Sequence, residues 1–199
     1  MSDCGAEQTA KLEKKTLIVL LLINAFMFVA EFILGWLAQS TGLIADSLDM
    51  LADATVYGLS FYAAGKGILD QAKAAQISGF LQIILGISVL FEVLRRLLFG
   101  SEPQSTFIIS VGAAALLANI ICLALISKHR KGGVHMRASW IFSANDVIAN
   151  LGVIVSGMLV AIIGSRLPDL IIGAIISLIV IRGGIKILQD TKQTRESAK

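Results

Sequence analysis

Six long apolar segments make up most of this 199-residue sequence. They lie at residues 16–38, 41–64, 74–98, 105–127, 137–164 and 167–188. A helix rises about 1.5 Å per residue, so roughly 20 residues cross the ~30 Å hydrocarbon core of a bilayer. Each segment is long enough to do so. The sequence therefore predicts an all-α membrane protein with six transmembrane helices.

Little of the chain remains outside these segments. We expect a polar N-terminal tail at residues 1–15, a transmembrane domain at residues 16–189 and a short tail at residues 190–199. Pro103 and Pro168 fall in connections, where a missing backbone N–H interrupts no helix. No stretch is left for a soluble catalytic domain.

The composition agrees with a chain embedded in a lipid bilayer. Hydrophobic residues make up 56% of it, charged residues 16%, and the mean hydropathy is +0.81. Cys4 and Cys122 lie far apart, a spacing that indicates neither a disulfide framework nor a thiolate zinc site. The net charge of +3 is not gathered into a basic face with aromatic residues, so no nucleic-acid partner is expected.

Lysine and arginine are distributed unevenly between the two sides of the predicted bundle. With the N-terminus inside, fourteen of the seventeen basic residues lie on the inner side, and only Arg95, Arg96 and Arg166 lie outside. The positive-inside rule then places both termini in the cytoplasm, and we expect the inner (plasma) membrane of a bacterium. Arg95 and Arg96 follow Glu92 by three and four residues, a spacing that favours a local ion pair.

The second apolar segment carries three aspartates, Asp46, Asp49 and Asp53. Spacings of three and four residues put all three on one face of a helix. A charge inside a spanning helix costs at least about 2.5 kcal/mol and survives mainly where it pairs or lines a path. Three neighbouring carboxylates in low dielectric must take up protons or bind a cation. The stripe therefore predicts a cation-binding site that exchanges metal with protons.

The fifth segment repeats this pattern more weakly, with Asn145, Asp146 and Asn150. Under the six-span topology the second and fifth helices run in opposite directions, so residues at equal depth have a nearly constant sum of sequence numbers. Asp49 with Asp146 and Asp46 with Asn150 give almost the same sum. These polar groups are therefore predicted to lie level with one another near the middle of the membrane.

Four further residues have open interpretations. Glu31 in the first segment is part of a proton path, the partner of a basic residue, or a packed neutral acid. His129 and His135 lie in a basic connection, where side chains are usually solvated; loose recruitment of metal is the alternative. The same two interpretations apply to Cys4 in the N-terminal tail.

At these residues the chain resembles the cation diffusion facilitator family of six-span divalent-metal/proton antiporters. Residues 40–54 look like the family's second helix, whose His/Asp-x-x-x-Asp pair binds metal, and Asp49 and Asp53 match that pair. The fifth segment is similar to the family's fifth helix, and Asp146 matches its metal-binding aspartate. The resemblance covers about residues 16–190. It implies export of a divalent metal from the cytoplasm by alternating access, with no permanently bound cofactor.

The sequence departs from the family pattern in the fifth segment. The family usually has His or Asp four residues before the aspartate, whereas Phe142 stands there in this chain. The fourth metal ligand is therefore open between Asn150, Asn145 and Asp46. A site of carboxylate and amide oxygens is harder than one with imidazole. Zinc is expected from the family, with cadmium, cobalt, manganese and iron as alternatives.

The family resemblance further implies a cytoplasmic domain through which many members dimerise, and we expect this protein to lack it. Any homodimer is therefore expected to form through the membrane helices.

Two classes of membrane enzyme also place acids within their spans. The motif of phosphatidyl-alcohol transferases requires glycine after its first acids, but Met50 follows Asp49, and the Gly-x-Gly-Asp of intramembrane aspartyl proteases is absent. We therefore expect no enzyme. A non-transporting metal-binding membrane protein or a channel remains the alternative to a transporter.

Overall fold

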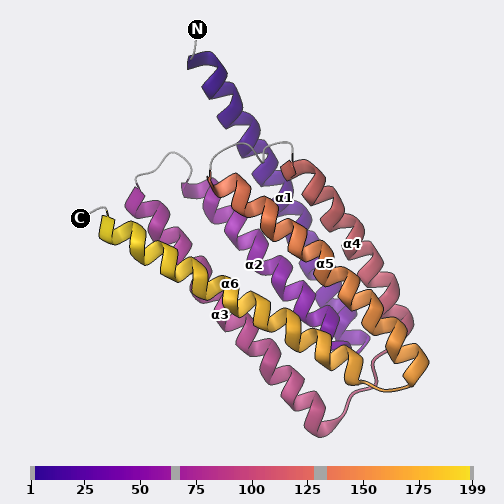
Figure 1. Ribbon diagram of the computed structural model, residues 1–199. Coiled ribbons are helices and arrows are strands. Elements are labelled where there is room, and N and C mark those ends of the chain that lie inside the picture. Colours follow the sequence, from indigo (N-terminus) through magenta and orange to yellow (C-terminus); the bar gives the residue numbers. More distant parts are fainter. Residues whose placement is uncertain (1–2, 64–67, 128–133, 198–199) are drawn as a thin grey trace.

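The computed structural model describes residues 3–63, 68–127 and 134–197 (Figure 1). Its helices are α1 (Asp3–Leu37), α2 (Thr41–Ala63), α3 (Ile68–Phe99), α4 (Ser105–Ser127), α5 (Val134–Ile163) and α6 (Leu167–Ser197). Over these ranges all regular secondary structure is helical. The predicted all-α class and six-helix count are confirmed.

Several helices extend beyond the predicted apolar segments. α1 begins at Asp3 and α6 ends at Ser197, so most of both predicted tails is helical, and α3 and α5 begin a few residues earlier than expected. Hydropathy locates only the part of a helix that lies in hydrocarbon. Lys, Glu, Gln and Ala are good helix formers and continue the helix into water.

Five of the helices contain stretches long and apolar enough to cross a membrane. These stretches are Lys14–Leu37, Ala72–Phe99, Ser105–Ser127, Ser143–Ile163 and Leu167–Glu196. α2 is not among them because it carries three aspartates, although its 23 residues are long enough to span. α2 contacts all five other helices, and residues 41–47 are completely buried. Protein rather than lipid therefore surrounds the polar side chains of this first part of α2, including Asp46.

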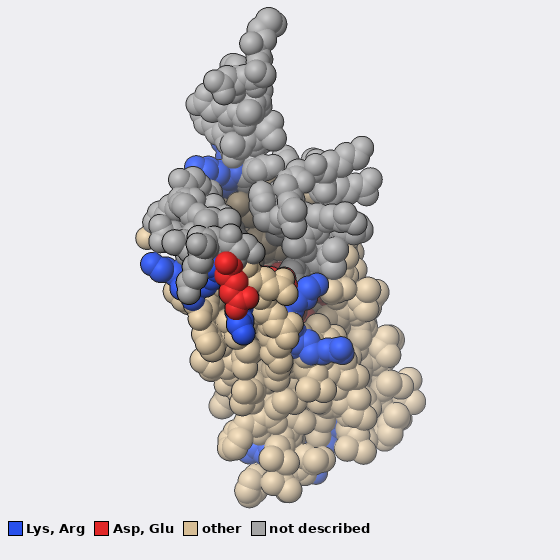
Figure 2. Space-filling model, turned by 60° about the vertical axis from the view of Figure 1, so that its left-hand side comes forward, with Lys and Arg blue, Asp and Glu red and all other residues tan. Residues whose placement is uncertain are grey.

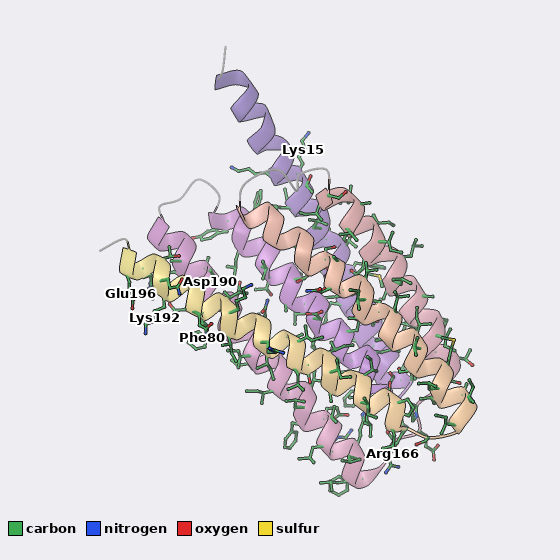
Figure 3. All side chains as sticks on the ribbon, viewed as in Figure 1. Lys15, Phe80, Arg166, Asp190, Lys192 and Glu196 are labelled. Carbon is green, nitrogen blue, oxygen red and sulfur yellow. The ribbon has the colours of Figure 1, made fainter. Side chains whose placement is uncertain are left out.

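The helices pack most extensively in the pairs α1 with α2, α4 with α5, and α3 with α6. Both termini lie at one end of the bundle, and the connections α1–α2, α3–α4 and α5–α6 lie at the other (Figure 1). Lys15, Lys192 and Glu196 are found toward the end with the termini and Arg166 at the opposite end (Figure 3). Between the two ends the visible face is largely uncharged (Figure 2).

The ion pair predicted at the end of α3 is present. Glu92 accepts hydrogen bonds from Nη2 of Arg95 at 2.7 Å and from Nε of Arg96 at 2.6 Å. Arg96 is buried, whereas Arg95 is exposed. Arg166 donates a hydrogen bond of 3.4 Å to the carbonyl oxygen of Leu97 and so lies at the same end of the bundle.

The backbones of α3 and α6 approach closely at two glycines. A Cβ added to Gly184 would lie 2.7 Å from the carbonyl oxygen of Gly79, and one added to Gly79 would lie 3.0 Å from that of Gly184. No other residue fits without displacing one helix. Small residues at a contact between membrane helices allow such close packing.

A carboxylate from α6 caps the start of α2. The side chain of Asp169 accepts hydrogen bonds from the Ser40 hydroxyl at 2.5 Å, from the Thr41 backbone N–H at 2.5 Å and from the Gly42 backbone N–H at 3.1 Å. Ser40, Thr41 and Asp169 are fully buried. The first N–H groups of a helix have no partner within the helix, and a carboxylate satisfies them and interacts well with the helix dipole. Asp169 thus fixes α2 at the end opposite the termini.

Candidate metal site

The three aspartates of α2 differ in how completely the other helices cover them. Asp46 lies in the completely buried first part of the helix, with 1% of its surface exposed. Asp49 and Asp53, toward the other end, are partly exposed. The acidic stripe therefore runs from a sealed region near the capped end toward the end that bears the termini.

Asp53 and Asp146 form the more accessible part of the site. Their carboxyl groups lie within hydrogen-bonding reach of each other, between α2 and α5. The hydroxyl of Tyr57 donates a long hydrogen bond of 3.5 Å to Asp53. Two carboxylates in contact repel each other unless a proton or a cation lies between them. The pair is therefore suited to exchanging these two species.

Asp46 and Asn150 form the deeper part. The Nδ2 group of Asn150 donates a hydrogen bond of 3.2 Å to Oδ1 of Asp46, and a second of 3.0 Å to the carbonyl oxygen of Asp146 one turn earlier. Both side chains are fully buried. The predicted equal depth of Asp46 and Asn150 is confirmed.

The other predicted pairing differs by about one turn. Asp146 reaches Asp53 rather than Asp49, although Asp49 is close enough to act on it electrostatically. Sums of sequence numbers compare positions along the helix axes, whereas long side chains lean toward the N-terminus of their own helix. α2 and α5 run in opposite directions, so the side chains of Asp53 and Asp146 lean toward each other.

Two candidates from the fifth segment do not join this group. Asn145 lies about 100° around the helix from Asp146, and it is exposed. It is therefore not a neighbour of the buried Asp46–Asn150 pair. Phe142 belongs to α5, but its side chain lies outside the described part of the chain, as do those of His129, His135 and Cys4.

The acidic groups do not converge on one point. Within the described residues, no three His, Cys, Asp or Glu side chains lie close enough together to hold a metal ion. Simultaneous binding by Asp49, Asp53 and Asp146 therefore requires side chains to turn or helices to move from the arrangement seen here.

Glu31 lies at the deep end of the same group. It is fully buried on α1, and its carboxyl group is within hydrogen-bonding reach of that of Asp46. In the described part of the protein no donor reaches either of its oxygens. The sequence left its role open because one acid in an apolar helix does not indicate which neighbours it has.

Sequence reasoning missed the role of Asp169. Its position two residues after the start of an apolar segment is typical of an acid in the first turn of its own helix. The structure shows that it caps a different helix, α2. A signal was present in the Ser40-Thr41-Gly42 sequence, which is typical of a helix start, but it did not identify the partner.

Comparison with known proteins identifies similar sequences. Residues 74–194 match the family described as the cation efflux transmembrane domain. The zinc transporter ZitB of Yersinia pseudotuberculosis is 23% identical over 193 residues, covering 89% of this chain and 61% of that protein. A cadmium, cobalt and zinc/H(+)-K(+) antiporter of Bacillus velezensis is 23% identical, covering 90% of this chain and 61% of its own length.

The metal cation efflux system protein CzcD of Cupriavidus metallidurans is 25% identical over 178 residues, covering 83% of this chain and 56% of that protein. This chain thus spans about three fifths of the length of these relatives. All three are named as transport or efflux proteins, which agrees with the interpretation that the chain is not an enzyme. The match covers more than half of the sequence and includes the α5 acid, so the chain belongs to the cation efflux transmembrane domain family.

Proposed function

We propose that this protein exports a divalent metal cation from the cytoplasm in exchange for protons. Asp49, Asp53 and Asp146 are the metal-binding carboxylates, and Asp46 or Asn150 supplies a further oxygen. The observation that carries the proposal is the proximity of the Asp53 and Asp146 carboxyl groups, with Asp49 one turn away, inside a membrane bundle. Such a group is unfavourable in low dielectric unless its charge is compensated.

The gradient of exposure supports entry from the end with the termini. Asp49, Asp53 and Asp146 are partly exposed, whereas Asp46 and Asn150 are sealed and Asp169 closes the start of α2. The excess of basic residues in the predicted inner connections supports a cytoplasmic position for the end with the termini. A cation therefore enters from the cytoplasm, in a bacterial plasma membrane.

Proton exchange follows from the ligand type. A carboxylate must be deprotonated to bind metal, so binding releases protons and protonation expels the metal. Helix movement that opens the capped end while closing the other then exposes the site to the outside, where protons replace the cation.

The metal is proposed from the donor set and from the relatives. Those relatives are named for zinc, cadmium and cobalt. Oxygen donors alone also admit manganese and iron. We propose zinc as the main cargo, and a homodimer through the membrane helices where the protein self-associates.

Metal-driven proton flux in proteoliposomes tests the function. The purified full chain is reconstituted, and zinc, cadmium, cobalt, manganese and iron are added in turn. Wild type should move protons against at least one metal, and Asp49→Ala should abolish the flux while inserting normally. Glu102→Gln, in the exposed α3–α4 connection, is the matched control and should keep the wild-type rate. Undiminished flux in Asp49→Ala would contradict the proposal.

Phe142 favours one second candidate. Because Phe142 replaces the usual fifth-helix ligand, the second candidate is a protein that binds metal without transporting it. Saturable metal binding with no proton flux for any metal identifies such a non-transporting binding protein. Metal flux that continues without proton movement and without saturation identifies a channel.

A further inference from the structure

The deep group of polar side chains contains oxygens that no described donor satisfies. These are both carboxyl oxygens of Glu31, Oδ2 of Asp46 and Oδ1 of Asn150. All three residues are at most 1% exposed. Buried polar atoms are nearly always hydrogen-bonded, so these four oxygens are available to a shared proton or to a bound cation.

These oxygens come from three different helices. Glu31 lies on α1, Asp46 on α2 and Asn150 on α5. Asp46 lies next to both of the others: it accepts a 3.2 Å hydrogen bond from Asn150, and its carboxyl group lies near that of Glu31. The Nδ2 group of Asn150 donates hydrogen bonds to Asp46 and to the backbone carbonyl of Asp146. The Oδ1 atom of Asn150 has no described donor and remains available to a cation.

The charge of this group suits a divalent cation. Two carboxylates and one neutral amide carry a formal charge of −2, which one divalent ion neutralises. Carboxylate and amide oxygens are ligands for hard and borderline divalent metals. A neutral assembly is the arrangement that a sealed, low-dielectric region tolerates best.

We propose that Glu31, Asp46 and Asn150 form a second divalent-cation site, one step deeper than the Asp49–Asp53–Asp146 site. This proposal rests on the proposed function, because the second site receives the ion that the Asp49–Asp53–Asp146 site takes from the cytoplasm. Asp46 and Asn150 then act in the deeper site and not only as extra ligands of the first one. Glu31 becomes the residue that distinguishes the two sites.

Binding stoichiometry tests the second site independently of transport. The full chain in lipid nanodiscs is dialysed against Cd²⁺ or Zn²⁺ at neutral pH, and bound metal is counted per chain. Wild type and the control Glu102→Gln should bind two ions, Glu31→Gln one and Asp49→Asn one. Two ions bound to Glu31→Gln would overturn the second site. One ion in wild type and none in Asp49→Asn would also overturn it while leaving the proposed function intact.

Failure of the proposed function gives a different result. In that case Asp49→Asn binds as many ions as wild type, whatever Glu31→Gln does. Metal-free Glu31→Gln should unfold at a temperature no lower than wild type, because a neutral side chain is easier to bury.

If Glu31→Gln does not fold, Glu31→Asp replaces it in the test. This variant keeps the negative charge, but its side chain is one methylene shorter, so its carboxyl oxygens lie farther from Asp46 and Asn150. It should retain the second ion at clearly weaker affinity, and unchanged affinity would count against the site.

Discussion

The side-chain amide of Asn150 on α5 donates a 3.2 Å hydrogen bond to the carboxylate of Asp46 on α2, and both residues are fully buried. This bond connects the two helices that carry the candidate metal ligands. A buried carboxylate that loses its donor bears the cost of its desolvation without compensation. The bond therefore contributes to stability as well as to the site.

Replacement of Asn150 should affect both properties. Asn150→Ala leaves Oδ1 of Asp46 without its donor and should lower the free energy of unfolding by about 1–3 kcal/mol. It should also slow metal-driven proton flux, because one oxygen of the deep group is lost. Thermal unfolding in detergent and flux in proteoliposomes measure the two effects. Asn145→Ala, at an exposed position on the same helix, should match wild type in both assays; equal behaviour of the two variants would refute a role for Asn150.

Metal affinity should rise with pH. Each carboxylate that binds the cation must first lose any proton it holds, so protons and metal compete for the same oxygens. Affinity should increase roughly tenfold per pH unit for each proton displaced. Calorimetric titration with Cd²⁺ at pH 6, 7 and 8 gives the slope. Asp49→Asn should show a shallower slope than wild type, and a pH-independent wild-type affinity would rule out proton exchange at these residues.

The cap on α2 should contribute substantially to stability. Asp169→Ala removes the acceptor of three buried hydrogen bonds and should cost about 2 kcal/mol or more. Asp169→Asn keeps one acceptor oxygen and should lie between Asp169→Ala and wild type. Chemical unfolding in detergent ranks the variants. Asp190→Ala, exposed near the other end of α6, serves as the control and should be neutral.

Adding a side chain at the glycine contact between α3 and α6 should destabilise the protein. Gly184→Ala places a Cβ 2.7 Å from the carbonyl oxygen of Gly79, which forces the helices apart and should cost about 1–3 kcal/mol. The unfolding temperature in detergent reports this loss. Ala161→Val adds two methyl groups at an exposed position of α5 and should have little effect. A Gly184→Ala protein as stable as wild type would show that the two backbones separate easily.

The sequence predicted the number of helices and the alignment of Asp46 with Asn150, because these depend on local patterns and on helix direction. Apolar runs define the spans, and spacings of three and four place Asp46, Asp49 and Asp53 on one face. The opposite direction of α2 and α5 was enough to pair Asp46 with Asn150. The helix ends outside hydrocarbon were predicted less well, because hydropathy does not register a helix that continues into water.

What the sequence did not predict depends on contacts between distant segments. Asp169 caps α2 from α6, and no local spacing relates these two helices. Glu31 joins Asp46 because α1 packs against α2, which its isolated position in an apolar run does not indicate. The pairing of Asp53 with Asp146 depends on the direction in which each side chain points along its helix. Sums of residue numbers compare only the positions of the backbone.

The glycine contact between α3 and α6 has a mechanical consequence. Where Gly79 meets Gly184 the two backbones are so close that neither helix has room for a side chain at the contact. We therefore expect α3 and α6 to move together as one unit. α6 also touches the start of α2 closely, because a Cβ on Gly173 would lie 2.9 Å from Cγ2 of Thr41. We therefore expect this contact to stay in place when α3 and α6 move relative to the other helices.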